Sequence, residues 1–381
     1  MQNIQKQITR LYLSTVLGSL SLTGAWVAIL AARGYTLVEI GFAETVFHIT
    51  SLILEIPSGV LADVFGRKNM LIVSSMMRMT GNIMMIVSGN LWMICISMMF
   101  QAASYNFSSG SGEALAYDSL KSEEQEDRYE KYASDQLILY RLCGGISTLC
   151  AGFALFIGYQ AAYGADLLIG IAQMWVLRSL SEVRCCEHEK NGRSPQPGSA
   201  MRSRKFRTAL FAIRSELVSC FLMSLGFMKK AKRAVLLMFC NSMVGAVDVL
   251  LLFFLQAKLP KAGMPGHVLG FTLFFMQLGG ILGARLILRC KKLRYRSVFA
   301  ITASLVLCGV LAEHSGRYLL MTAGGFAAAL SDDALQVRTN TILQDMFPSE
   351  QRATLISMES FTFSMIMIVL SPLAGVLFSH W

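Results

Sequence analysis

The sequence predicts an all-α integral membrane protein, on the strength of three observations. Of the 381 residues, 54% are hydrophobic and only 15% are charged, whereas soluble domains average about 25% charged residues. Apolar stretches long enough to cross a bilayer as helices recur along the whole chain. Lysines and arginines gather in alternate connections between those stretches. Together these observations exclude a soluble globular protein.

Eleven stretches are predicted to be membrane-spanning helices. They lie at residues 9–32, 37–62, 70–89, 91–118, 133–157, 161–180, 234–258, 266–289, 297–315, 317–343 and 351–378. The apolar part of the first, Leu11 to Ala32, is too long for the core of a cleavable signal peptide. We therefore expect it to remain as the first helix.

The basic residues predict the orientation, because cytoplasmic loops are enriched in Lys and Arg. With the N-terminus in the cytoplasm, most bases fall in cytoplasmic connections, including those between 289 and 296. The external segments would hold only Arg33, Lys258, Lys261 and Arg317. Eleven helices then place the C-terminus outside. The net charge of +10 thus reflects the bases of the cytoplasmic connections and does not indicate a nucleic-acid partner.

The predicted helices divide the chain into three regions. These are a bundle of six helices at 1–180, a basic cytoplasmic linker at 181–233 and a bundle of five helices at 234–381. Within the linker, Phe206 to Met228 is amphipathic and could be counted as a twelfth span. It contains Arg214 and Glu216, and inserting it would move the bases at 289–296 outside. We interpret it as a helix lying on the cytoplasmic face of the membrane.

A charged, glycine-bearing segment joins the second and third predicted helices. It includes Gly59, Asp63, Gly66, Arg67 and Lys68. Gly66 permits a tight turn, and the two bases anchor the loop in the cytoplasm. In spacing and composition the segment resembles motif A, the signature loop of the major facilitator superfamily.

This resemblance implies two bundles of six helices related by a pseudo-twofold axis along the membrane normal. A twelfth helix is then missing from the sequence, either because the chain is shortened or because it is a natural variant. The resemblance also implies that Asp63, Arg67 and Asp118 form a charge network that closes the cytoplasmic side.

A second segment, residues 109–120, resembles a branch of the superfamily that contains presumed drug exporters. The run at 55–59 is similar to the same branch. The resemblance implies a multi-pass protein of the bacterial cytoplasmic (inner) membrane. The fifth predicted helix departs from the pattern of drug–proton antiporters, because the proline expected near Gly144 and Gly145 is absent.

Ionisable residues inside the predicted helices mark candidate sites, because a charge at membrane depth costs roughly 3 kcal/mol or more. In the second helix, Glu44, His48, Ser51 and Glu55 have helical spacing and share one stripe. The stripe either lines a cavity or packs against polar groups of a neighbouring helix. Further candidates for the substrate cavity are Tyr105, Asn106, Asn241, Phe275, Gln277, Gln336 and Glu359.

Acids at membrane depth are candidates for proton coupling, since an acid without a partner can bind and release a proton as access alternates. In order of preference these are Glu113, Asp248, Glu55 and Asp333. Two bases at similar depth, Arg78 and Arg141, are the candidate partners. We expect Glu113 to pair with one of these two arginines.

No pattern in the sequence indicates an enzyme, a metal site or a nucleotide-driven pump. There is no Gly-x-x-x-x-Gly-Lys-[Ser/Thr] loop, and Cys185-Cys186-Glu187-His188 lacks a second pair of ligands. We expect no cofactor and no metal, with the proton gradient as the energy source. The 23 methionines and the aromatic residues suggest an apolar cavity for amphipathic molecules.

The sequence thus predicts a monomeric secondary transporter that exports small amphipathic molecules or drugs by alternating access and proton antiport. An importer or facilitator of nutrients on the same fold is the first alternative, because these motifs do not encode direction or substrate. A non-transporting scaffold is the second alternative, favoured by the missing twelfth helix.

Overall fold

The computed structural model describes residues 2–182, 231–290, 292–346 and 352–379. Within these ranges all regular elements are helices. The first half contains α1 (Gln2–Ser19), α2 (Trp26–Ala32), α3 (Leu37–Phe65), α4 (Arg67–Val87), α5 (Leu91–Ser108), α6 (Ser111–Lys121), η1 (Glu126–Arg128), α7 (Tyr129–Leu149), α8 (Ala151–Ile157) and α9 (Tyr159–Arg178). The second half contains α11 (Lys232–Lys261), α12 (Gly266–Arg289), α13 (Tyr295–Glu313), α14 (Tyr318–Met346) and α15 (Arg352–Ser379). The amphipathic segment Phe206 to Met228 and the run Cys185 to His188 lie outside the described residues.

The eleven predicted ranges each fall on one helix or on two consecutive helices. In the described part of the chain, six helices are long and apolar enough to cross a membrane. The number rises to seven if α7 and α8, which meet at a bend of 46°, form one span. Backbone N–H and C=O groups in lipid must be paired within the segment, so apolar stretches of this length become helices. The all-α prediction is confirmed.

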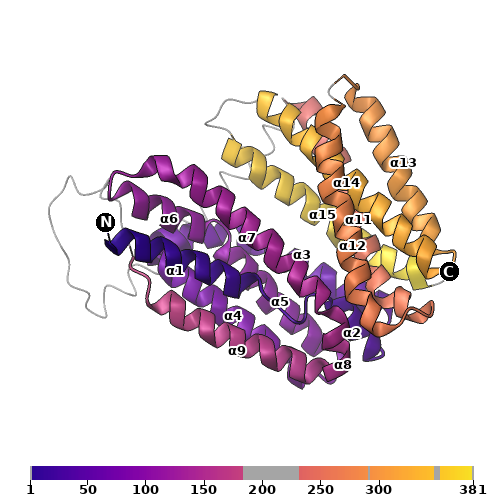
Figure 1. Ribbon diagram of the computed structural model, residues 1–381, viewed down its shortest axis with the longest axis horizontal. Helices are drawn as coiled ribbons and strands as arrows, with labels where there is room; N and C mark the ends of the chain where they lie inside the picture. Colours follow the sequence, from indigo (N-terminus) through magenta and orange to yellow (C-terminus); the bar gives the residue numbers. More distant parts are fainter. Residues whose placement is uncertain (1, 183–230, 291, 347–351, 380–381) are drawn as a thin grey trace.

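The helices form two bundles, coloured indigo to magenta and orange to yellow in Figure 1. In the first bundle α4 packs against α5 and α9, and in the second α14 packs against α12 and α13. Between the bundles, α3 packs along α15, α12 contacts α7 and α8, and α2 contacts α11. The relative position of the bundles therefore depends on these three sets of contacts.

The bundles contact each other near the end that holds the C-terminus and diverge towards the end that holds the N-terminus (Figure 1). Glycines allow this contact. A Cβ on Gly41 of α3 would collide with the backbone of Ser371 in α15, and a Cβ on Gly270 of α12 would collide with the backbone of Leu149 in α7. Small residues let helices approach to backbone contact in a membrane.

Three predicted spans are interrupted, which corrects the continuous helices expected at 9–32, 91–118 and 133–157, the last of which is divided into α7 and α8. Residues 20–25 separate α1 from α2. Gly110, with a φ of +71°, separates α5 from α6. Such a φ is open to glycine and strained for most other residues.

The break between α1 and α2 is held by a carboxylate of another helix. Asp166 of α9 accepts hydrogen bonds from Ser21 Oγ at 2.6 Å and from the backbone N–H of Leu22 at 2.7 Å. These bonds replace the helical partners of the unwound segment. Irregular backbone at membrane depth is tolerated where it is buried in protein or lines a cavity.

Candidate functional site

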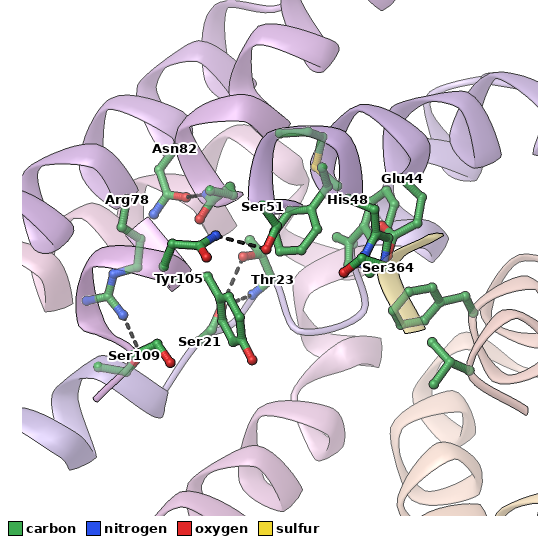
Figure 2. Close-up of a pocket in the computed structure, with 18 of the residues that line it drawn as sticks. Ser21, Thr23, Glu44, His48, Ser51, Arg78, Asn82, Tyr105, Ser109 and Ser364 are labelled. Atoms are coloured by element: carbon green, nitrogen blue, oxygen red, sulfur yellow. Dashed lines mark hydrogen bonds and ion pairs between the residues drawn. The ribbon is translucent and has the colours of Figure 1, made fainter. Parts of the chain in front are cut away.

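A cavity of about 990 Å³ lies between the two bundles. Its wall includes the break between α1 and α2 and side chains from α3, α4, α5, α7, α9, α11, α14 and α15. Most of these side chains carry a hydrogen-bonding group, and several are drawn in Figure 2. The wall therefore combines many hydrogen-bonding groups with the apolar and aromatic surface expected from the sequence. Aromatic rings are the minority, among them Trp26, Phe253 and Phe363.

The polar stripe on α3 faces this cavity. Glu44, His48, Ser51 and Glu55 all line it. Glu44 Oε1 lies 3.3 Å from His48 Nε2, and Asn106 of α5 donates to Ser51 Oγ at 2.8 Å. The stripe therefore lines the cavity and also packs against a polar group of its neighbour.

Arg78 of α4 is fixed in the wall of the cavity by the first bundle. Its guanidinium donates to the backbone oxygen of Gly18 at 2.5 Å and to Gln173 Oε1 of α9 at 2.6 Å. Asp166 attracts it electrostatically. Arg78 thereby ties α4 to α1 and α9 close to the break that Asp166 holds.

Glu113 forms no ion pair with Arg78 or Arg141 in the described part of the chain, which corrects the expected pairing. It occupies the first turn of α6 and is exposed. Burial raises the pKa of the Tyr129 phenol at the start of α7, and the nearby Glu113 carboxylate raises it further. An acid in the first turn of a helix is stabilised by the helix dipole.

Four predicted cavity residues do not line the cavity. Asn241 of α11 donates to Glu359 Oε1 of α15 at 3.0 Å, so this pair joins two helices of the second bundle. The side-chain amide of Gln277 of α12 donates a hydrogen bond to a threonine hydroxyl of α7 at 3.1 Å. Phe275 stacks on a ring of α14, with centroids 4.9 Å apart. These contacts between helices were not visible in the sequence, and they correct the cavity assignment of all four residues.

Tyr105, Asn106, Gln336 and Arg141 do line the cavity. Arg141 is exposed to it, and Asp333 of the second bundle attracts its guanidinium electrostatically. Gln336, one turn further along α14, provides an amide on the facing wall. Both bundles thus contribute polar side chains to the cavity.

Three carboxyl groups gather inside the second bundle. Asp248 of α11 is 4% exposed, and its Oδ1 has no hydrogen-bond partner among the described residues. Asp332 and Asp333 of α14 both act on it electrostatically. Glycines make room for them, since Asp332 packs against Gly245 and Asp333 against Gly280. Neighbouring carboxyl groups can share a proton.

Motif A lies at the end of α3 opposite to its contact with α15. Gly66 joins α3 to α4 with a φ of +98°. Arg67 Nη1 donates to the backbone oxygen of Ala114 at 2.8 Å and forms an ion pair with Asp118. Asp63 is in α3, but its side chain is outside the described part of the structure, and Gly59 is exposed on the same helix. The described part of the network ties α4 to α6.

Glu182 completes this end of the bundle and was not singled out from the sequence. Its two carboxylate oxygens accept the backbone N–H groups of Arg67 and Lys68, each at 2.9 Å. An acid at this position satisfies orphan donors of a helix and complements its dipole. Lys68 Nζ donates to the backbone oxygen of Arg178 at 2.9 Å. The start of α4 is therefore bound to the segment that follows α9.

Two residues that hold the backbone at the site were missed for a common reason. Glu182 lies 115 residues after Arg67, and Asp166 lies 144 residues after Leu22, so no local pattern links them. For Asp166 one signal exists, because it is an acid inside the apolar stretch predicted at 161–180.

Comparisons with known proteins agree with this architecture. The family model described as Major Facilitator Superfamily matches residues 11–228, more than half of the chain. A sequence search of curated proteins finds no match. Among solved structures, a D323A mutant of the nucleoside transporter NupG has a TM-score of 0.73 at 11% identity, over 97% of this chain and 91% of that chain.

Two further structures extend the comparison. Another crystal structure of NupG gives a TM-score of 0.70 at 12% identity, over 99% of this chain and 91% of that one. A D-xylose–proton symporter gives 0.65 at 10% identity, over 97% and 90%. At such identities the likeness shows the fold alone. Family model and fold together establish that the chain belongs to the major facilitator superfamily, and it is a membrane transporter and not an enzyme.

Proposed function

We propose that this chain is a secondary active transporter of small polar solutes that works by alternating access and is driven by the proton gradient. The observation that carries the proposal is the cavity between the bundles, whose wall presents hydrogen-bonding side chains on both sides. His48 and Asn106 line it from the first bundle, and Gln336 and Ser364 from the second. A bound solute would contact both bundles, so a change in their relative position can transfer it across the membrane.

The arrangement of the bundles supports alternating access. They touch through Gly41 and Gly270 at one end and diverge towards the motif A end. With the N-terminus in the cytoplasm, as the basic residues predict, the closed end faces outside. In this conformation the cavity would exchange solute with the cytoplasm, and the opposite rocking motion would expose it to the exterior.

Import by proton symport is the direction we propose. The similar structures are those of a nucleoside transporter and a D-xylose–proton symporter, both of which handle polar solutes. Their likeness to this chain is one of fold, but it agrees with the polar wall of the cavity. Drug export, which the sequence motifs suggested, has no comparable support from the cavity.

For the proton carrier we propose Asp248 together with Asp332. Asp248 is almost fully buried, has an oxygen without a hydrogen-bond partner among the described residues, and adjoins a second carboxyl group. Two adjoining carboxyls can hold a shared proton and release it when their surroundings change. Glu55 and Asp333, which are nearer the cavity, are the alternative carriers. Glu113 is the weakest candidate, because it is exposed.

Export of amphipathic molecules is the second candidate function, and one groove favours it. An apolar groove of about 450 Å³ lies between α11 and α15 and is lined by Met238, Met243, Met358 and Met365 among others. Methionine side chains re-pack around varied apolar shapes. A hydrophobic substrate would meet this groove and not the polar cavity.

Transport by the purified protein in liposomes, with a pH-sensitive dye inside, distinguishes these functions. Nucleosides, sugars, amino acids and an amphipathic cationic dye are offered across a pH gradient. We expect a polar solute to move together with protons, and Asp248→Asn to abolish the proton signal. Asp127→Asn, an exposed acid before α7, is the matched control and should transport normally.

The remaining outcomes are equally informative. Movement of the amphipathic dye alone would establish the second candidate. Polar transport with no proton movement in any variant would establish a facilitator. A folded protein that moves none of these solutes would contradict the transporter proposal and favour a scaffold.

A further inference from the structure

The end of α12, the start of α13 and the short connection between them carry a dense group of basic side chains. We call residues 285–296 the basic connection. Its described Lys and Arg side chains are all exposed, and they are those of Arg285, Arg289, Lys292, Arg294 and Arg296. The sequence contains no Asp or Glu between Asp248 and Glu313, so the basic connection has no acid of its own.

These five positive charges have no counter-charge in contact with them among the described residues. None of the five side chains makes a hydrogen bond or an ion pair with another described residue. Like charges that lie close together repel one another and raise the free energy of the folded protein. The basic connection therefore presents uncompensated positive charge to its surroundings.

The connection between the second and third spans of the first bundle, at motif A, is different. Arg67 forms an ion pair with Asp118, and Lys68 Nζ donates to a backbone oxygen at 2.9 Å. The carboxylate of Glu182 accepts the backbone N–H groups of Arg67 and Lys68. In the first bundle the protein thus supplies its own acids, whereas the basic connection of the second bundle depends on an external anion.

The basic connection is fixed on the second bundle. Arg338 of α14 donates to the backbone oxygen of Leu293 at 3.0 Å, and the hydroxyl groups of Tyr295 and Thr339 lie 3.1 Å apart. Tyr295 also packs against the apolar cluster at the start of α11. A segment that is already held in place loses little conformational freedom when it binds a ligand.

The place of the basic connection puts it at the surface of the membrane. It joins α12 and α13, which are both long and apolar enough to cross a bilayer. Exposed leucines lie among the bases, since Leu286, Leu288 and Leu293 are 41%, 57% and 41% exposed. Such a mixture suits the boundary between acyl chains and headgroups, where long basic side chains reach out to the headgroups.

We propose that the basic connection binds the headgroups of anionic phospholipids in the adjacent leaflet. Clusters of about four or more bases directly beside a membrane-spanning helix attract anionic lipids. A guanidinium group binds a phosphate through two parallel hydrogen bonds, and four of the five bases are arginines. The lipid supplies the missing negative charge and covers the exposed leucines with its acyl chains. A soluble anion would supply only the charge.

Native mass spectrometry of the purified protein tests the proposal, because it resolves bound lipids and gives their dissociation constants. Dioleoyl phosphatidylglycerol is compared with dioleoyl phosphatidylcholine, which has the same acyl chains and a zwitterionic headgroup. We expect the anionic lipid to bind roughly 10- to 100-fold more tightly. The preference should shrink at a higher concentration of ammonium acetate, since salt screens exposed charges.

A variant of the basic connection assigns the contact. R289Q/K292Q/R294Q should bind phosphatidylglycerol roughly 10- to 100-fold more weakly than the parent and bind phosphatidylcholine unchanged. An unchanged melting temperature shows that the variant is folded. If it is not folded, the single variants R289Q and R294Q replace it, and each should lose roughly fivefold in affinity for the anionic lipid.

The matched control removes the same charge from the first bundle. K6Q/R128Q/K131Q changes three exposed bases at the motif A end, and the stretch around the last two also contains acids. This variant should keep the preference of the parent for phosphatidylglycerol. The control separates binding at the basic connection from a general effect of net charge.

Equal affinity of the parent for the two lipids would overturn the proposal. An equal loss in the two triple variants would also overturn it, because the preference would then follow net charge and not the basic connection. Displacement of the lipid by an equal concentration of ammonium phosphate would identify a site for soluble anions and contradict the lipid assignment. These outcomes leave the transporter proposal standing, since lipid binding is measured without any solute gradient.

Discussion

At the scale of single residues, Gly66 shows how motif A depends on backbone geometry. Its φ of +98° is a conformation that residues with a Cβ rarely adopt. A Cβ at this position would also lie 2.9 Å from the carboxyl carbon of Glu182. Because that carboxylate caps α4, the glycine both makes the turn and leaves room for the cap.

Gly66→Ala should therefore destabilise the protein by about 1–3 kcal/mol, the usual cost of a strained backbone position. Thermal unfolding in detergent, followed by the melting temperature, measures the effect. Gly59→Ala is the control, because Gly59 is inside α3 and a Cβ there would meet no atom within 4 Å. That change should be neutral or stabilising by up to about 1 kcal/mol. Equal melting temperatures for both variants would contradict the argument.

The ion pair between Arg67 and Asp118 is the basis of a prediction about gating. Arg67 reaches α6 through this pair and through the backbone oxygen of Ala114. Loss of the pair should change how the motif A end of the first bundle closes, and thus transport. We expect Asp118→Asn and Asp63→Lys to cripple transport in liposomes, while membrane insertion, judged by yield and elution from a sizing column, stays normal. Normal transport by Asp63→Lys would exclude a gating role for that residue.

At the scale of helices, the break between α1 and α2 depends on Asp166. It is 6% exposed and accepts from Ser21 Oγ and from the backbone N–H groups of Leu22 and Thr23. Removing this carboxylate leaves buried donors without a partner. The unwound segment lines the cavity, so its shape is part of the binding site.

Asp166→Ala should lower stability by about 1–3 kcal/mol, the cost of leaving buried hydrogen-bonding groups unsatisfied. The melting temperature measures this effect, and Asp127→Ala, an exposed acid, is the control for loss of charge alone. Solute binding should weaken as well, because the wall of the cavity moves. An Asp166→Ala variant as stable as the control would mean that other contacts hold the break.

The positions of the helices could be predicted from the sequence, because an apolar stretch in lipid has to satisfy its backbone locally. The breaks between α1 and α2 and between α5 and α6 could not. Asp166 holds the break between α1 and α2 from another helix. Nothing in the local apolar sequence therefore distinguishes the unwound segment from a continuous helix. Gly110 does carry a local signal, but a glycine inside an apolar helix of a membrane protein is also common in unbroken helices.

The residues of the candidate site also divide into those whose place the sequence could predict and those whose place it could not. Glu44, His48, Ser51 and Glu55 share one face of one helix, so their spacing alone groups them, and they all line the cavity. Asn241 and Gln277 have the same polar character, yet each is used for a contact with another helix. Which polar residue meets the cavity and which meets a neighbour is decided by packing between helices, and the spacing along one helix carries no information about that.

At the scale of the whole molecule, the two bundles behave as bodies joined by close helix contacts at one end. Gly41 and Gly375 bring α3 and α15 into backbone contact, and Gly152 and Gly270 do the same for α12 against α7 and α8. Contacts of this kind are bistable, since helices that pack this closely either fit or separate. The glycines therefore favour the conformation in which this end is closed.

A large side chain at Gly270 should shift the population towards the opposite conformation, because Leu149 leaves no room for it. Gly270→Leu is compared with Gly164→Leu, a position on α9 where a Cβ would meet nothing within 4 Å. Spin labels replace Gln160 at the start of α9 and Lys261 at the end of α11, both exposed, in a background without native cysteines. The distance distribution in nanodiscs should broaden to longer values for Gly270→Leu alone. If both variants gave the parent distribution, the glycine contacts would not control which end is open.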